Sequence, residues 1–196
     1  EVTALAASMS LEQNAVLGIA MGTSEATGYV DTQGRVTSWL NELAFAPVDY
    51  SPNAPADEWS GDVGCGVQYF SQQAVGRLIP QTGLSIDPAL GLPEKLERVQ
   101  EFMTDGNEEA AAIYRTIGTY LGYGVAHYAS FYSISHALIL GRVTSGDGGT
   151  IILEEANKVL STEFPELNDK ITFHQPDEKN KRHGQAIAAA SLPSIN

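Results

Sequence analysis

The sequence contains one cysteine and few basic residues. Because Cys65 is the only cysteine among 196 residues, the chain can form neither an internal disulfide nor a cysteine-rich zinc site, and a reducing compartment is favoured. Eleven Lys and Arg stand against 24 Asp and Glu, and the resulting net charge of −13 disfavours nucleic acid and anionic membrane as partners. A nucleotide is still compatible with this composition, since backbone amides, a helix N-terminus or Mg²⁺ can offset the negative field locally.

Long apolar runs and targeting signals are also absent from the sequence. No apolar run reaches about 18 residues, so we expect no transmembrane helix, and no basic segment leads into an apolar one at the N-terminus. We therefore expect a cytoplasmic protein. Hydrophobic residues make up 43% of the chain, which suits one folded domain over residues 1–196. The chain begins at Glu1, without Met and directly in a helical pattern, which suggests a fragment or a processed product.

Local patterns predict an α/β fold in which helices cover a mixed sheet. We expect a hairpin over residues 15–31 and a third strand over 35–39, which together form an antiparallel meander of three strands. Two further short strands are expected at 137–140 and 171–173. Residues 40–63 contain three prolines and predict a long irregular loop, a kind of segment that often carries function. Helical patterns cover residues 1–13, 64–78, 93–104, 107–132, 150–162 and 183–191.

The first candidate site is a phosphate-binding hairpin. Residues 16–21 are almost wholly apolar, as in a strand covered on both faces. Gly22 ends this strand, where a ligand can approach the backbone closely, and Thr23 and Ser24 add hydroxyl and amide donors. The alternative, an ordinary buried hairpin with a glycine bend, stays open because a single Gly-Thr-Ser is a short motif.

The helix expected at 107–132 begins with strong signals and contains several glycines. Asn107 is a typical N-cap residue, and two glutamates follow in the first turn, where the helix dipole favours acids. Gly118, Gly122 and Gly124 lower the helix propensity of this segment. We therefore predict that the helix packs closely against another element.

The order of these motifs resembles the C-terminal half of the ROK family (repressors, uncharacterised frames and sugar kinases), in the actin-like ATPase superfamily. Met21-Gly-Thr23 is similar to the strand end and Gly-Thr-Gly phosphate loop of that family. Asn41-Glu42-Leu43-Ala44-Phe45 resembles its Gly-Glu-aliphatic-Gly-His sugar motif, with Phe45 in place of the histidine.

Three further stretches carry the resemblance. Gly64-Cys65-Gly66-Val67 follows the end of the family's cysteine cluster, with Val67 where the family has a second sugar-binding Glu. Ala-Leu-Ile-Leu-Gly-Arg-Val at 137–143 resembles its adenosine loop, Gly-Gly-x-Val, with Arg142 in place of the second glycine. The Ala-rich segments at 1–7 and 183–190 resemble the helix after the catalytic Asp and the closing helix.

The resemblance implies the ribonuclease-H-like fold of the actin-like ATPases, in its nucleotide-side domain. It implies a sugar substrate bound by Glu42 and Asn41, and it places the catalytic Asp before Glu1, so no catalytic residue is expected within this chain. With the histidine and the other cysteines absent, no zinc is expected, and the four scattered histidines predict no other metal site. ATP and Mg²⁺ are the implied cofactors, and the implied contacts are Gly22, Thr23, Ser24, Gly141 and Val143.

Several alternatives stay open. Ser24 and Glu25 stand where the family has glycines, and a Glu25 carboxylate would repel a phosphate. The leading hypothesis is part of a ROK-like sugar kinase, inactive as this fragment alone, with an N-terminal domain and a homo-oligomer as expected partners. A second is a non-catalytic ROK-like sugar-sensing or regulatory protein, and a third is an interaction domain that forms oligomers. Glu42 as a solvated side chain and Gly141 as an ordinary turn residue are the simpler alternatives at those two positions.

Overall fold

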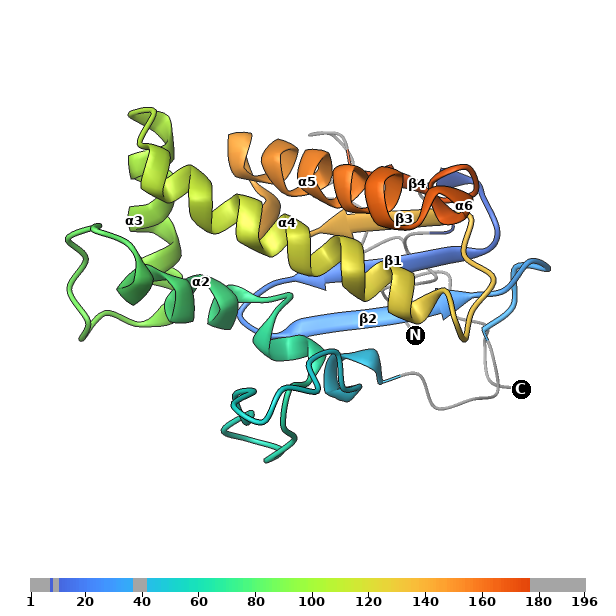
Figure 1. The fold of residues 1–196 in the computed structure, drawn as a ribbon, viewed down its shortest axis with the longest axis horizontal. Coiled ribbons are helices and arrows are strands. Elements are labelled where there is room, and N and C mark those ends of the chain that lie inside the picture. The colour runs from blue at the N-terminus through green and yellow to red at the C-terminus, as the bar shows by residue number, and fades with distance from the viewer. Residues whose placement is uncertain (1–7, 9–10, 37–41, 177–196) are drawn as a thin grey trace, which may run out of the picture.

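A computed structural model describes residues 8, 11–36 and 42–176 of the protein. These residues form a mixed four-stranded sheet in the order β2-β1-β3-β4 (Figure 1). Strand β1 (Val16–Met21) pairs antiparallel with β2 (Glu25–Val30) and parallel with β3 (His136–Leu140). Strand β4 (Thr172–His174) pairs parallel with β3 and is the outer strand on the side away from β2. The α/β class and a mixed sheet that helices cover are confirmed.

Strand β1 is buried on both of its faces, as its apolar sequence predicts. Leu17, Ile19 and Met21 point to one side and are fully buried in the main hydrophobic core. Val16 is equally buried but packs with Leu138 in a second, smaller cluster. Alternate residues of a strand point to opposite faces, so β1 joins two apolar layers and fixes the centre of the sheet.

Two of the three strands of the predicted meander are found in the described sheet. The described part of the expected third strand contains one isolated bridge, Val30↔Val36, and residues 37–39 lie outside the described residues. The chain turns there because the Asp31 carboxylate accepts hydrogen bonds from the amides of Gln33 (2.8 Å) and Arg35 (2.9 Å). The described sheet therefore has two antiparallel strands, followed by two parallel ones at nearly the predicted positions.

Short and long helices connect these strands, and most lie close to their predicted positions. The segment expected at 64–78 is divided into a 3₁₀ turn and a short α-helix, and the helix expected at 107–132 ends at Tyr128. The predicted helix at 183–191 and residues 1–7 and 9–10 of the predicted helix at 1–13 lie outside the described residues. The bounds are η1 Leu43–Phe45, η2 Gly66–Gln68, α2 Gln72–Leu78, η3 Ile79–Gln81, α3 Leu92–Thr104, α4 Glu108–Tyr128, η4 Arg142–Thr144, α5 Asp147–Glu163 and α6 Pro165–Asn168.

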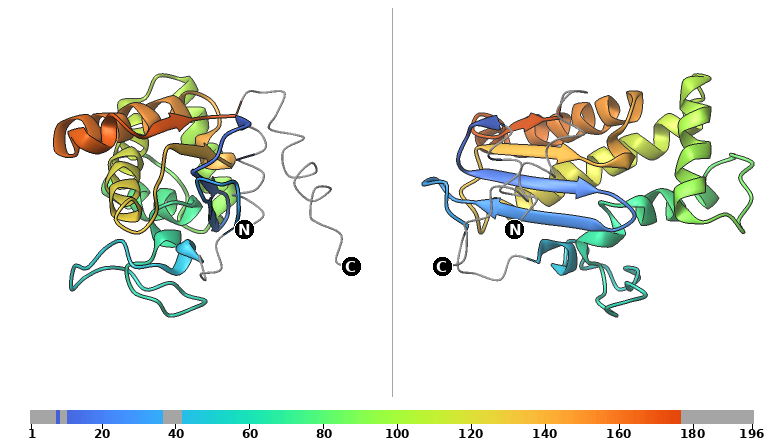
Figure 2. Two further views of the ribbon diagram at one scale, coloured as in Figure 1. Left: turned by 90° about the vertical axis from the view of Figure 1, so that its right-hand side faces the viewer. Right: turned by 180° about the vertical axis from the view of Figure 1, so that it is seen from behind.

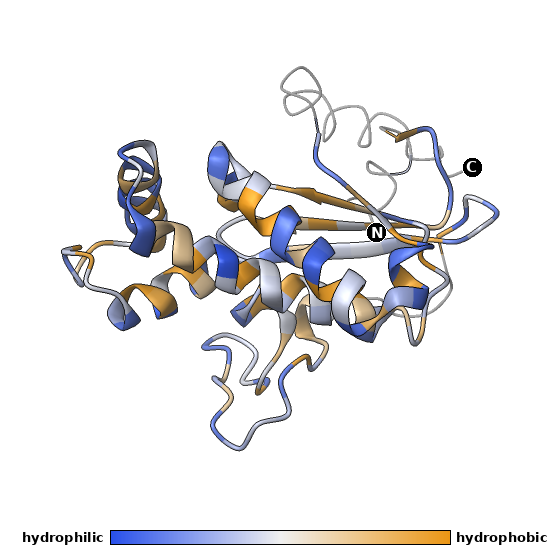
Figure 3. Ribbon diagram, turned by 45° about the horizontal axis from the view of Figure 1, so that its top comes forward, coloured by the Kyte–Doolittle hydropathy of each residue, from blue (hydrophilic) through white to orange (hydrophobic). Residues whose placement is uncertain are grey.

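Helix α4 begins where the sequence predicts. The Asn107 side chain accepts hydrogen bonds from the amides of Glu109 (2.9 Å) and Ala110 (3.1 Å), which would otherwise be unpaired at the helix start. Helices α4 and α5 lie side by side on one face of the sheet (Figure 2). Figure 3 shows hydrophobic ribbon along β1 and β3, beneath these helices.

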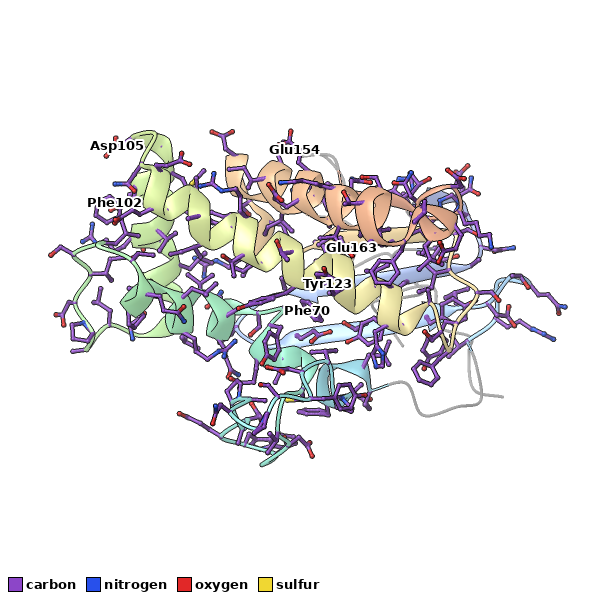
Figure 4. The ribbon with its side chains drawn as sticks, in the orientation of Figure 1. Phe70, Phe102, Asp105, Tyr123, Glu154 and Glu163 are labelled. Atoms are coloured by element: carbon purple, nitrogen blue, oxygen red, sulfur yellow. The ribbon has the colours of Figure 1, made fainter. Side chains whose placement is uncertain are left out.

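The glycines of α4 allow this close packing, as predicted. A Cβ on Gly118 would lie 2.6 Å from the carbonyl oxygen of Ile152 in α5, and one on Gly122 would lie 2.6 Å from Cβ of Val159. A Cβ on Gly124 would lie 2.5 Å from the ring of Phe70, which lies beside α4 (Figure 4). Each glycine therefore faces a neighbour that leaves no room for a side chain.

Within the described part of the chain, no helix combines the length and the apolarity needed to cross a bilayer.

Substituting Gly118→Ala tests the packing of α4 on α5. The added methyl group would meet backbone atoms of Ile152, and such overpacking costs about 1–3 kcal/mol. This exceeds the gain in helix propensity of about 1 kcal/mol. We expect urea unfolding to show a lower free energy of unfolding for this variant.

The matched control is Gly76→Ala in α2. Its Cβ would meet only the end of the flexible Leu92 side chain, at 2.7 Å, so the propensity gain should leave the free energy of unfolding unchanged or about 1 kcal/mol higher. Equal changes in the two variants would contradict the packing argument.

Candidate functional site

Two loops meet at one edge of the sheet, where β1 and β3 end. The strands are parallel and Ala20 lies opposite Leu140, so the residues that follow each strand come out side by side. Gly141 has a φ of +107°, and a Cβ there would lie 2.5 Å from the carbonyl oxygen of Met21. Only glycine permits this contact between the loops. In open α/β sheets, ligands bind outside the carboxyl ends of the strands, which is where this contact lies.

The hairpin at residues 22–24 presents free donors at this edge. The Gly22 amide donates to the Ser24 carbonyl (3.0 Å), and the Gly22 carbonyl accepts from the Gln72 amide (2.9 Å). Thr23 and Ser24 are exposed, and their amides donate to no other residue of the described chain. Of the three residues predicted to contact phosphate, Thr23 and Ser24 thus offer amides to an anion, while Gly22 shapes the turn.

Three side-chain hydrogen bonds fix the loop after β3, and two of them come from other parts of the chain. Gln100 of α3 donates to the Arg142 carbonyl (3.0 Å), and Gln175, just after β4, donates to the Thr144 carbonyl (2.6 Å). The Thr144 hydroxyl donates to the Gly141 carbonyl (3.0 Å). Val143, a predicted adenosine contact, is fully buried in the core, so its side chain supports the loop from inside. Gly141 and Arg142 are the exposed residues at the start of this loop.

A cavity of about 250 Å³ lies next to this loop, beside the first turn of α5. Its volume is slightly below the roughly 300–1,000 Å³ of typical ligand pockets, so it suits part of a ligand, such as a base. The first turn of α5 adds backbone amides and the positive end of the helix dipole. The cavity is lined by Gln100, Met103, Thr104, Tyr114, Ser145, Gly146, Asp147 and Gly148.

Sequence reasoning named none of the residues that line this cavity as a ligand contact, and Tyr114 is the large buried one among them. Its side chain is fully buried, and its hydroxyl has no hydrogen-bond partner among the described residues. Burial also raises the pKa of Tyr114 far above its usual value, so the hydroxyl stays a neutral donor and acceptor. A Cβ on Gly148 would lie 2.5 Å from the tyrosine ring, so the glycine at the start of α5 makes room for it. The Gly148-Gly149 pair was the sequence signal for this close approach.

Glu25 does not lie where an anion would meet it. The side chain is 6% exposed and points inward from β2, where the Thr27 hydroxyl donates to one carboxyl oxygen. The other oxygen has no partner among the described residues. Burial raises the pKa of Glu25 from 4.5 to about 8, so this group is mostly neutral at pH 7. The structure therefore does not support the expectation that Glu25 repels phosphate, because its carboxyl group is buried and mostly neutral at pH 7.

Only some of the residues at the predicted sugar-binding positions are exposed in the described structure. Glu42 is exposed directly before η1 and its side chain makes no hydrogen bond within the described chain, while Asn41 lies outside the described residues. Val67 is 1% exposed and belongs to the core, and the Phe45 ring packs 5.7 Å from the Trp59 ring. Glu42 is thus the one described residue of the predicted sugar motif with a polar side chain in solvent.

The long loop between η1 and η2 is organised by hydrogen bonds. The amides of Val48 and Asp49 both donate to the Gly64 carbonyl, at 2.8 and 3.0 Å. The Tyr69 hydroxyl donates to the Asp49 carboxylate (2.5 Å), and the Arg77 guanidinium lies 4.9 Å from the centre of the Tyr69 ring. Among residues 8, 11–36 and 42–176, no three His, Cys, Asp or Glu side chains are placed to share a metal ion.

Comparison with solved structures shows the same fold in ROK proteins. A ROK transcriptional regulator described as a homologue of the E. coli MLC protein matches with a TM-score of 0.70 at 18% identity. The ROK hexokinase from Thermus thermophilus matches with a TM-score of 0.67 at 16% identity. A ROK glucokinase from Streptomyces griseus, solved with glucose and AMPPNP, matches with a TM-score of 0.62 at 20% identity. The resemblance to ROK proteins is confirmed at the level of the fold.

These matches cover most of this chain but only part of each structure. The regulator, the hexokinase and the glucokinase match 96%, 95% and 88% of this chain, which spans 50%, 61% and 59% of their own lengths. No family model and no curated protein matches the sequence.

Substituting Tyr114→Phe tests whether the buried hydroxyl lacks a partner. Removing an unpaired buried hydroxyl relieves its desolvation penalty, so we expect the free energy of unfolding to be unchanged or higher by up to about 1 kcal/mol. The control is Tyr29→Phe, which removes a hydrogen bond to the Ser133 carbonyl (2.8 Å) and should cost about 1 kcal/mol. Chemical denaturation measures both, and a loss in Tyr114→Phe equal to that of the control would reveal a partner.

Proposed function

We propose that this chain is the nucleotide-side domain of a ROK-like sugar kinase, which transfers phosphate from ATP to a sugar hydroxyl. The proposal rests on one observation: two loops and a cavity lie together at the edge of the sheet where β1 and β3 end. The exposed amides of Thr23 and Ser24, the glycine contact at Gly141 and the cavity beside Tyr114 lie along that edge. The ROK fold of the chain supports this assignment.

ATP fits the residues at this edge in a simple way. Its phosphates would accept hydrogen bonds from the Thr23 and Ser24 amides, and its base would occupy the cavity that Tyr114 helps to line. Arg142 is exposed beside Gly141 and forms no ion pair with another described residue, so its guanidinium is available to a phosphate. Mg²⁺ would neutralise phosphate charge in a strongly acidic protein.

The sugar would lie on the side of Glu42 and Asn41. A carboxylate can accept two sugar hydroxyls, which suits the exposed Glu42. Phosphoryl transfer depends mainly on positioning and charge stabilisation, so this chain's part is to hold the nucleotide in line with that sugar. We assign the catalytic base to a segment outside residues 1–196, and the whole protein to a cytoplasmic homo-oligomer with an N-terminal domain.

Substituting Ser145→Trp tests the cavity as the base site. Ser145 is exposed at the cavity wall, so an indole there should block the base without disturbing the core. We expect calorimetry to show at least tenfold weaker binding of Mg-ADP, equivalent to about 1.4 kcal/mol. The control Ser161→Trp makes the same change on the exposed far part of α5 and should bind like the wild type. Unaltered affinity in Ser145→Trp would place the base elsewhere.

The reaction itself needs the intact gene product. We expect coupled assays on a panel of hexoses to show sugar-dependent ATP consumption by that product, and none by residues 1–196 alone. No turnover with any hexose, alongside circular dichroism and melting data that confirm folding, would reject the kinase assignment.

A non-catalytic sugar-sensing protein is the second candidate. Two positions of the family's sugar motifs are apolar here, since Val67 is buried and Phe45 packs on Trp59. The similarity to a ROK transcriptional regulator is consistent with this candidate. Calorimetry distinguishes the two, because a sensor would bind sugar without binding Mg-ADP.

A further inference from the structure

We propose that Glu25 is a positioning residue: as a neutral acid it ties the 22–24 hairpin to the η1 and η2 turns, and its ionisation loosens them. The ligand-binding part of this proposal rests on the proposed function. The structural part, a contact between three segments that depends on one proton, does not.

The geometry around Glu25 brings these segments to one point. That point is the place a Cβ on Gly66 would occupy, 2.5 Å from the unpartnered Glu25 oxygen. The carbonyl oxygen of Leu43 lies 2.9 Å from the same point, and the Tyr128 hydroxyl lies 3.1 Å from it. A glycine is required in η2 because the carboxyl group fills the space of its side chain. Strand β2, both turns and the end of α4 therefore lie around one small space, which the unpartnered Glu25 oxygen borders.

The carboxyl group also lies between the two proposed ligand segments. Glu25 directly follows Ser24 of the hairpin, and Leu43 directly follows Glu42. When protonated, the Glu25 side chain carries one hydroxyl donor, and the Leu43 carbonyl and the Tyr128 hydroxyl are acceptors around it. When ionised, it carries a charge in a site where Thr27 supplies the one hydrogen bond that it accepts within the described chain.

The groups that face Glu25 do not compensate this charge. Tyr128 from α4 and Cys65, next to η2, are the titratable neighbours, and burial raises the pKa of both above their usual values. Both stay neutral while Glu25 ionises, since its pKa is about 8. The unfolded-state pKa of 4.5 is lower, so the closed arrangement loses stability as pH rises from about 4.5 to about 8, and the loss levels off above that.

Hydrogen exchange on the 196-residue chain tests the structural part. After correction for intrinsic rates, we expect the hydrogen-bonded amides of Gly22, Phe45, Gly66, Gln68 and Tyr69 to exchange at least tenfold faster at pH 9 than at pH 6.5. The variant Glu25→Gln, which keeps the shape without the charge, should abolish this increase. The control Glu154→Gln removes an exposed carboxylate on α5 (Figure 4) and should respond to pH like the wild type. Equal pH responses in wild type and Glu25→Gln would overturn the proposal.

A second measurement decides the matter if Glu25→Gln fails to fold. The ¹³C chemical shift of the Glu25 carboxyl in the wild type follows its protonation directly. A titration midpoint near 8 supports the proposal, and a midpoint near 4.5 overturns it.

The ligand part is tested by Mg-ADP affinity between pH 7 and pH 9. We expect the wild type to lose severalfold more affinity than Glu25→Gln over this range. The variant cannot ionise at position 25, so it serves as the control for titration of the ligand itself. Equal pH dependence in the two proteins would overturn the ligand part. If neither protein binds Mg-ADP at any pH, the proposed function fails, while hydrogen exchange still decides the role of Glu25.

Discussion

The contact between α4 and α5 sets the geometry of the rest of the molecule. Two glycines of α4 let its backbone approach α5 more closely than any side chain would allow. This approach fixes where α5 begins, and therefore where its first turn meets the loop after β3. The same helix carries Tyr114 to the cavity and Tyr128 to the buried carboxyl group. The positions of these two tyrosines thus depend on one apolar packing arrangement.

Those parts of the fold that rest on local signals could be predicted from the sequence. The apolar run of β1 predicted a central strand, Asn107 predicted the start of α4, and the α4 glycines predicted close packing. The third strand of the meander is represented within the described residues by one antiparallel bridge, Val30↔Val36, and its residues 37–39 lie outside them. The predicted turn before it is present, because the Asp31 carboxylate accepts hydrogen bonds from the Gln33 and Arg35 amides. Strand pairing depends on partners far along the chain, which a local pattern does not contain.

The candidate site was predictable only in outline. The order of motifs located the two loops, because each follows a strand that the sequence marks clearly. Side-chain burial could not be predicted in the same way, because the sequence suggested that Glu25 would repel a phosphate and that Val143 would contact the nucleotide, yet both side chains are buried. Tyr114 was missed because it lies in the middle of a helix and reaches the site only through tertiary packing. Sequence reasoning thus located the two loops of the site, while the buried side chains around them were identified only in the structure.

The burial of Cys65 has a practical consequence. The only thiol of the chain is fully inaccessible, and it lies in the bridge Pro47↔Cys65 that closes the long loop between η1 and η2. A thiol reagent can reach it only when that loop opens, so a single natural residue reports the opening rate without any engineered label. The protein therefore contains its own probe for the motion of the segment nearest the proposed sugar side.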